Sequence, residues 1–474
     1  MLNINIGLSA LDMLPSLEKM WQLSARKIHA TEQCWDAAEG TPVFTARGRW
    51  VSCGQSGWTR GFQYGSSLLQ YDATGEQEFL ADALENTRGR IAPDQPHTGM
   101  HDHGFNTVST FGNLLRLWHD NRLPANLGGT PGDRLFFELA LKVSGATQAA
   151  RWTELSGNSG YIHSFNGPHS LFACTIRSLR TLALSHLLGH MSSDGQNKRI
   201  NLLERLLRHG ETIACYNVYF GNKRDSYDIR GRVAQESIFD LSNGCYRCPS
   251  SQQGYSPFST WTRGLAWIML GFTEQLDFLE MLPTAQYKNI LAADLTDKKE
   301  FCRRFLEVAR ATADFYLDNC PTDGVPYWDT GAPGLTKMGD YLSRQSDPYN
   351  ENEPVDSSAA VIAAQALLRL GQYISSKGDP GQGGKYIAAG LTVASSLLDE
   401  PYLSTDENHH GLLLHSLYNR PGGWDHVPDG SVIPCGESSM WGDYHFRELA
   451  LLIRRMAING PAYRFYPEQA VRKN

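Results

Sequence analysis

Hydrophobic positions along the chain recur mainly with the 3.6-residue period of a helix. Residues 105–118 carry one apolar stripe at Phe105, Val108, Phe111, Leu114, Leu115 and Trp118. Residues 170–189 also follow a helical pattern, and residues 356–371 predict a helix that Asp356 caps and Gly371 ends. Alternation typical of β-strands is scarce over more than a few residues, so the pattern predicts an all-α protein.

Two kinds of predicted helix alternate along the chain. Segments of the first kind start with a polar or aromatic motif and continue with small and apolar residues; they begin at Trp58, His101, Gly167, Ser259, Asp356 and Gly442. Segments of the second kind are amphipathic with charged faces, and they follow Gly75, Gly132, Asn201, Asp297 and Gly383. Because helices that are apolar all round belong inside and amphipathic helices outside, this alternation predicts an (α/α)6 barrel.

We expect the barrel to be one domain spanning residues 1–474, with an N-terminal helix and lead-in over about residues 1–50 and a tail over 465–474. Parallel inner helices would place their N-termini at one end. Free N–H groups and partial positive charge at those ends favour an anionic ligand. The irregular loops over 156–169 and 216–259 are long enough to shape a site.

Composition narrows the class of protein. The formal net charge of −7 argues against nucleic acid or an acidic membrane as a partner. No apolar run reaches about 18 residues, and the N-terminus lacks the pattern of a secretory signal. Nine cysteines, an odd number, argue against a disulfide framework and indicate a reducing, cytoplasmic location. Aromatic residues make up 11% of the chain, which fits either a large core or a cleft that stacks on sugar rings.

Familiar cofactor and metal motifs are absent from the sequence. It contains no GxGxxG in a βαβ setting, no P-loop, no HExxH and no GxSxG. The pair Cys245 and Cys248 has no second pair or suitably spaced histidines, so we interpret it as a plain loop and predict neither metal nor cofactor. The expected partner is a small-molecule substrate, and the expected state is a monomer or a homodimer.

The motif HDHGF supplies the first candidate for chemistry. It places Asp102 between His101 and His103 at a predicted helix start. A carboxylate there could act as an acid or base whose pKa its neighbours set. Aspartate is also a good N-cap, so a purely structural role for Asp102 is the alternative.

The motif STWTRGLAW supplies the second candidate. Arg263 and Trp267 share one helix face, where Arg could bind a carboxylate or sulfate and Trp could stack on a ring. The alternative is that Trp267 is core and Arg263 pairs with a structural acid. His163 and His169 lie in the polar segment YIHSFNGPHS, which we expect to form a cleft wall, whereas DSSAA and GDYHF look structural.

These motifs, with GVPYWD and QGYSPF, resemble the ordered motifs of the unsaturated glucuronyl hydrolases, glycoside hydrolase family 88. The resemblance runs from about Trp58 to Phe446. It implies an (α/α)6 barrel without a cofactor. It also implies removal of an unsaturated uronic acid from the non-reducing end of oligosaccharides that polysaccharide lyases produce, by hydration of the C4=C5 enol ether.

The resemblance also assigns site residues. Asp102 matches the catalytic aspartate and His101 its substrate-contacting neighbour. WTRGFQYG, which begins with Trp58, is similar to the first inner helix of the family. The remaining matches to substrate-site positions are Gln253, Arg263 and Trp267.

Two positions depart from the family pattern. Cys174 occupies the place of the second catalytic aspartate, and Gln235 that of a substrate-binding histidine. A thiol can donate a proton but is a poor substitute for a carboxylate. Three interpretations stay open: His163, His169 or Glu236 serves as the acid, Cys174 acts itself, or the site binds uronyl sugars without turnover. A uronate lyase on the same barrel is a further alternative.

Overall fold

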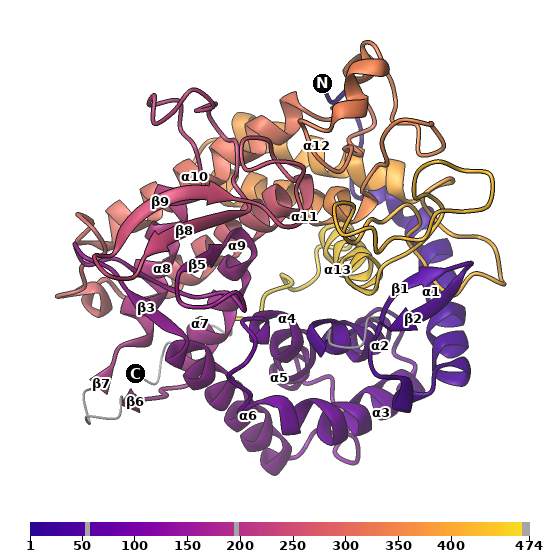
Figure 1. The fold of residues 1–474 in the computed structure, drawn as a ribbon. Helices are drawn as coiled ribbons and strands as arrows, with labels where there is room; N and C mark the ends of the chain where they lie inside the picture. The colour runs from indigo at the N-terminus through magenta and orange to yellow at the C-terminus, as the bar shows by residue number, and fades with distance from the viewer. Residues whose placement is uncertain (53–56, 194–198, 467–474) are drawn as a thin grey trace.

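The computed structural model describes residues 1–52, 57–193 and 199–466, and its helices form two concentric rings (Figure 1). The inner ring consists of α2 (Arg60–Thr74), α4 (His103–Thr107) with α5 (Asn113–His119), α7 (Leu179–Leu187), α9 (Thr262–Met281), α11 (Ser357–Ser376) and α13 (Met440–Ala457). The outer ring consists of α1 (Leu14–Cys34), α3 (Gln77–Asn86), α6 (Pro131–Ala150), α8 (Leu202–Tyr216), α10 (Lys298–Asp318) and α12 (Pro380–Leu397).

The inner ring closes on itself. Each inner helix packs against the next one along the chain, and α13 packs against α2. Each outer helix covers an inner one, as α12 covers α11 and α3 covers α2. The architecture is therefore the all-α (α/α)6 barrel that the sequence predicts.

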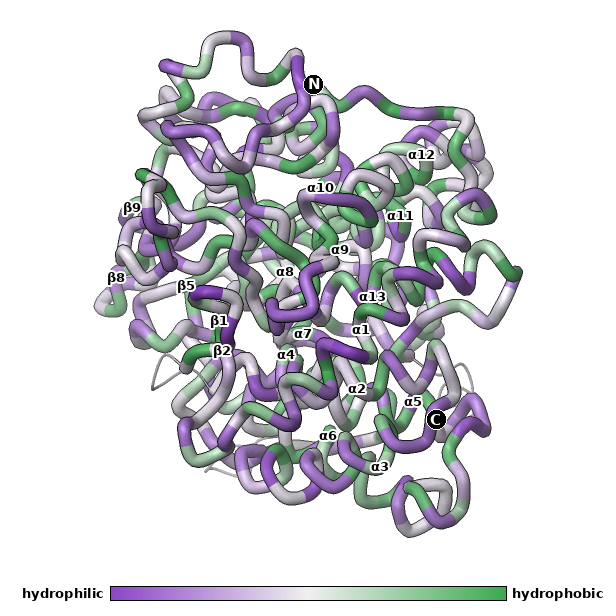
Figure 2. The backbone as a smooth tube through the Cα atoms, turned by 90° about the vertical axis from the view of Figure 1, so that its right-hand side faces the viewer, coloured by the Kyte–Doolittle hydropathy of each residue, from purple (hydrophilic) through white to green (hydrophobic). Residues whose placement is uncertain are grey.

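Burial separates the two rings as expected. Most of α11 is buried, including its small residues Ala359, Ala360, Ala363 and Ala364, whereas α12 and α10 bury one face each. Figure 2 shows hydrophobic stretches along the helices and hydrophilic stretches at the outer turns. Buried apolar residues fill the layer between the rings and also the inside of the inner ring, where Phe105 of α4 packs against Trp267 of α9.

Two predicted helix boundaries are wrong. Helix α11 does not end at Gly371 but continues to Ser376. A Cβ on Gly371 would lie 2.5 Å from the carbonyl oxygen of Gly383, so this glycine permits the close approach of α12. Residues 170–172 are a strand rather than the start of a helix, because they pair with a strand far along the chain.

The long loops contain short antiparallel strands that periodicity missed. β5 (Ser170–Phe172), β8 (Glu236–Asp240) and β9 (Cys245–Ser250) form one sheet in the order β5-β8-β9. Cys245 and Cys248 therefore lie on a strand and not in a plain loop. The other pairs are β1 (Pro42–Ala46) with β2 (Arg49–Ser52), β3 (Trp152–Glu154) with β4 (Gly160–Ile162), and β6 (Ser192–Ser193) with β7 (Arg199–Ile200).

The predicted helix over 105–118 is present with an irregular turn. Residues Val108–Gly112 adopt a π-helical turn between α4 and α5. The third inner helix likewise begins with a 3-10 segment, Ala173–Ser178, before α7. Of the predicted tail, Phe465 and Tyr466 are buried, and residues 467–474 lie outside the described part of the chain.

Two negative findings apply to the described ranges. None of the helices in them combines the length and apolarity that a membrane span requires. In the same ranges, no three metal-ligating side chains come together as a site for a metal ion.

Candidate active site at the starts of the inner helices

Asp102 occupies the N-cap position of α4, but its carboxylate makes no capping hydrogen bond. Instead Oδ1 lies 3.3 Å from Nε2 of His101, and 15% of the side chain is exposed. The carboxylate is thus turned toward its imidazole neighbour and remains accessible to a ligand. A purely structural capping role does not describe this geometry.

Cys174 lies beside this pair at the start of the third inner helix. Its Sγ is 3.7 Å from Nε2 of His101. Burial and the nearby charge of Asp102 raise the pKa of the Cys174 thiol, so the thiol stays protonated at neutral pH. The first departure from the family pattern therefore places a neutral thiol close to the carboxylate of Asp102.

His101 is held in place by rings and by a backbone contact. Burial lowers the pKa of its imidazole, which favours the neutral form. The ring stacks on Phe165 at a centroid distance of 5.7 Å, and Ser178 Oγ donates to the His101 carbonyl oxygen. Phe165 itself is 58% exposed. An exposed aromatic ring next to a catalytic candidate is a surface on which a sugar ring can stack.

The loop before the third inner helix brings His163 close but not His169. Burial, Arg151 and His101 lower the pKa of His163 to about 4. Arg151 donates to the carbonyl oxygen of His163 at 3.2 Å, which fixes this loop. His169 accepts a backbone hydrogen bond from Phe239, and within the described residues no contact joins its imidazole to Asp102.

Glu236, the third alternative acid, is occupied elsewhere. It is buried on β8, and its Oε1 accepts hydrogen bonds from Asn166 Nδ2 at 3.0 Å and from Ser170 Oγ. These bonds tie the loop to the sheet. Glu236 therefore supports the loop that carries His163 rather than facing Asp102.

Arg263 reaches the site, but its terminal nitrogens are bound to protein. Nη1 donates to Asp356 Oδ2 at 3.2 Å and to the Leu417 carbonyl oxygen. Nη2 donates to Gln253 Oε1 at 2.9 Å and to the Tyr418 carbonyl oxygen at 2.7 Å. The predicted free fork for an anion is thus absent, because a buried guanidinium needs its full set of acceptors. Arg263 orders Gln253 and residues 417–418 instead.

The second departure, Gln235, acts in the same network. Its Oε1 accepts hydrogen bonds from the backbone N–H of Gln253 at 2.9 Å and from Ser251 Oγ at 3.1 Å. Gln235 thereby shapes the turn that presents Gln253 to Arg263.

The predicted tryptophans form an aromatic layer under the site. Trp58 stacks on Trp441 with ring centroids 5.0 Å apart and lies 6.0 Å from Phe105. Phe105 in turn contacts Trp267 at 4.9 Å. Trp267 is buried to 2% exposure, so it belongs to the core as the alternative interpretation had it, whereas Trp58 stays half-buried.

The sequence analysis missed three residues near Arg263, namely Tyr418, Trp424 and Asp425. Burial raises the pKa of Asp425 to about 6, against the lowering effect of N–H donors from Tyr418 and Asn419. Trp424 is 52% exposed, and its ring centroid lies 5.2 Å from that of Tyr418. The hydroxyl oxygen of Tyr418 accepts a hydrogen bond from Trp58 Nε1. The segment GGWDH combined an acid with an aromatic residue, a signal that could have marked it.

Buried His209 supports the segment that carries Cys174. Its environment predicts that the free energy of unfolding falls at acidic pH. It contacts Thr175 Oγ1 and the backbone N–H of Ile162, and burial lowers its pKa to about 3. The unfolded chain binds a proton near pH 6.5 and the folded one does not, so stability falls as the pH drops below 6.5. We expect a loss on the order of 2–3 kcal/mol between pH 6.5 and 4.5 from this group.

Urea denaturation at several pH values checks this expectation. The variant His209→Gln should show a flatter pH dependence of the unfolding free energy than the wild type. His97→Gln, which removes an exposed imidazole, should leave the slope unchanged. Equal slopes for His209→Gln and the wild type would contradict the assignment.

The fold and this arrangement define an (α/α)6 barrel with an acid, a neutral imidazole and a thiol at the starts of its inner helices. No protein-family model matches the chain. An unsaturated glucuronyl hydrolase from Formosa agariphila is 26% identical over 395 residues, which cover 82% of this chain and 78% of the relative. One from Bacillus sp. strain GL1 is 29% identical over 217 residues, 46% of this chain and 45% of the relative.

Solved structures agree on the fold. The unsaturated glucuronyl hydrolase of Bacillus sp. GL1 superposes with a TM-score of 0.66 at 20% identity, covering 92% of this chain and 97% of the other. An unsaturated glucuronyl hydrolase specific for heparin gives a TM-score of 0.67 at 20% identity, with 94% and 98% covered. Together the comparisons confirm the resemblance to the unsaturated glucuronyl hydrolases, which are glycosidases, over most of the chain.

Proposed function

We propose that the protein is a glycoside hydrolase that removes an unsaturated uronic acid from the non-reducing end of lyase-generated oligosaccharides. The observation that carries the proposal is the carboxylate of Asp102, free of any capping bond and beside His101. The similarity to unsaturated glucuronyl hydrolases over 82% of the chain supports the substrate class. The exposed rings of Phe165 and Trp424 support a sugar ligand.

The chemistry needs one acid/base group. The carboxyl of Asp102 donates a proton to C4, the C4=C5 electron pair forms the new C–H bond, and water bonds to C5. The water gives one proton to the carboxylate and keeps the other in the new C5 hydroxyl, so Asp102 recovers its starting state. The resulting hemiketal opens to a ketone, and the aglycone leaves from C1 with its oxygen.

The surrounding residues position the sugar in this scheme. His101, kept neutral by burial, contacts the uronate ring next to Asp102. Arg263 acts indirectly, since it holds Gln253 and the Tyr418 carbonyl in place. Cys174 donates its S–H hydrogen bond but does not serve as a base, because its thiol stays protonated.

Loss of the double bond's ultraviolet absorbance tests the proposal. Unsaturated disaccharides from glycosaminoglycans, pectin, ulvan and gellan should include at least one whose absorbance falls on incubation with the protein. A rise in absorbance on the intact polysaccharides would instead reveal a uronate lyase. No change with any of these fragments would refute hydrolysis.

The thiol at position 174 favours a second candidate, a barrel that binds uronyl saccharides without turning them over. Exchange of Cys174 separates the two candidates. If the enzyme is active, Cys174→Ala should retain at least about a tenth of kcat/KM, since a weak S–H donor contributes little. If it only binds, calorimetry should detect saccharide binding without turnover, and Cys174→Asp should create measurable hydrolysis.

We further propose a cytoplasmic location and a monomeric or homodimeric state. The odd number of nine cysteines supports a reducing compartment. Gel filtration with light scattering measures the oligomeric state directly.

A further inference from the structure

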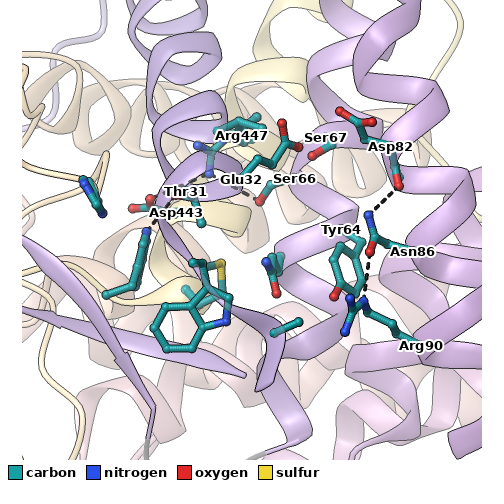
Figure 3. Close-up of a pocket in the computed structure, with 18 residues that line it drawn as sticks. Thr31, Glu32, Tyr64, Ser66, Ser67, Asp82, Asn86, Arg90, Asp443 and Arg447 are labelled. Carbon is teal, nitrogen blue, oxygen red and sulfur yellow. Dashed lines mark hydrogen bonds and ion pairs between the residues drawn. The ribbon is translucent and has the colours of Figure 1, made fainter. Parts of the chain in front are cut away.

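A pocket of about 270 Å³ lies between α1, α2, α3 and α13, on the outer side of the inner ring. Figure 3 shows its polar lining, with Tyr64, Ser66 and Ser67 from α2, Asp82, Asn86 and Arg90 from the region of α3, and Asp443 and Arg447 from α13. Asp102, Cys174 and Arg263 are not among the residues that line it. The pocket is therefore separate from the candidate active site.

Two hydroxyls in this pocket, on largely buried residues, make no hydrogen bond within the described part of the protein. Tyr64 is 9% exposed and Ser67 is 4% exposed. In residues 1–52, 57–193 and 199–466, neither side-chain oxygen takes part in a hydrogen bond. Both oxygens are accessible from the pocket, so a ligand with donors and acceptors can form hydrogen bonds with them.

The charges at the α13 side of the pocket are compensated by protein partners. Arg447 donates to Ser24 Oγ at 2.8 Å and to Ser66 Oγ at 3.3 Å, and it lies 3.8 Å from Asp443. Asp443 also accepts hydrogen bonds from backbone N–H groups, including that of Leu413 at 2.9 Å. This corner therefore offers no free charge to a ligand.

Two carboxyls in the lining, Glu32 of α1 and Asp82 of α3, disfavour an anion. Burial and the neighbouring Asp82 raise the pKa of Glu32 to about 7. A second negative charge placed beside these two carboxyls would be repelled in the same way that they repel each other. A neutral ligand fits this lining better than a uronate or a phosphate.

Aromatic surface completes the lining. Trp35 and Trp50 both border the pocket, and their indole N–H groups are already used: Trp35 Nε1 donates to the Gly40 carbonyl oxygen and Trp50 Nε1 to Thr31 Oγ1. Ring surface is therefore what they offer. Apolar ring surface next to unpaired hydroxyls suits the C–H face and hydroxyl edge of a pyranose.

We propose that this pocket binds one neutral monosaccharide, as a second sugar site apart from the catalytic one. Its volume lies just below the range of about 300–1,000 Å³ that ligand pockets span, so it accepts one ring rather than a chain. The hydroxyls of Tyr64 and Ser67 bond to the sugar, and the neighbouring carboxyls of Glu32 and Asp82 disfavour its oxidised, acidic counterparts. This site goes beyond the proposed hydrolase activity and does not depend on it.

Saturation-transfer NMR with the full-length protein tests the site. The probes are glucose, galactose, xylose and rhamnose, each compared with glucuronate. We expect at least one neutral sugar to bind with millimolar affinity, and Tyr64→Phe and Ser67→Ala each to weaken it about 3–10-fold, as loss of one hydrogen bond predicts. Tyr227→Phe, an exposed tyrosine elsewhere, is the matched control and should bind as the wild type does.

Each variant removes a single oxygen atom, and circular dichroism verifies that it folds. Binding that both pocket variants leave unchanged would place the sugar elsewhere and overturn the proposal. So would the absence of binding by all four neutral sugars, or binding of glucuronate as tight as that of the best neutral sugar. The absorbance assay is run in parallel, and it should give the same hydrolytic rate for the pocket variants and the wild type, so failure of one proposal leaves the other standing.

Discussion

Replacement of Asp102 by asparagine should lower kcat/KM for an unsaturated uronyl disaccharide by about 1,000-fold. A positioned acid/base group contributes roughly 10²–10⁴-fold to the rate, and asparagine cannot deliver a proton to C4. The side chain keeps its shape, and it makes no capping bond that could be lost. The free energy of unfolding should therefore change little, and the loss should appear in kcat rather than in KM.

A second N-cap aspartate provides the matched control. Asp379 caps α12 by accepting a hydrogen bond from the backbone N–H of Gln382, far from the catalytic candidates. Asparagine caps helices as well as aspartate does, so Asp379→Asn should keep both stability and activity. Absorbance kinetics decide the matter: an Asp102→Asn enzyme with more than a tenth of the wild-type kcat/KM would remove Asp102 from the catalytic role.

The sequence could predict the barrel because the alternation of two helix types is a local property repeated along the chain. It could also locate Asp102, since a carboxylate between two histidines at a helix start is visible in five residues. The family resemblance, rather than a local pattern, assigns Cys174 to the start of the next inner helix. The structure brings its sulfur to the imidazole beside Asp102.

Arg263 shows where such reasoning fails. Its acceptors at Leu417 and Tyr418 are 154 and 155 residues away in the chain. Nothing in STWTRGLAW reveals whether the guanidinium will meet a ligand or such carbonyl groups. The pairing of residues 170–172 with β8 is equally remote, because a strand partner and not the local pattern determines that segment.

The pocket between α1, α2, α3 and α13 was invisible for the same reason. The sequence around Tyr64 and Ser67 is typical of an inner helix, and Glu32 belongs to a pattern that is typical of the charged face of an outer helix. Their combination exists only because four helices meet there. A cavity is a property of packing between elements, which a single sequence does not display.

The substitution Gly104→Ala adds one methyl group and should strongly lower the free energy of unfolding. Gly104 lies two residues after Asp102, where α4 crosses the start of the third inner helix. An added Cβ would collide with the Arg177 carbonyl group and lie 2.6 Å from the Cα of Ser178. Both neighbours are backbone atoms, which cannot rotate away as a side chain can. We expect a loss of about 3 kcal/mol or more, at the upper end for overpacking.

The same substitution should also reduce activity, because the crossing positions His101 against Cys174. Ser178 donates to the carbonyl oxygen of His101, so forcing the two segments apart breaks the contact that aligns the imidazole. Gly384→Ala in α12 is the control: its added methyl meets no atom within 4 Å, and alanine favours a helix by about 0.5–1 kcal/mol over glycine. Thermal and urea unfolding should thus show opposite shifts for the two variants. A Gly104→Ala protein as stable as the wild type would mean that the inner helices are not packed backbone to backbone at the catalytic end.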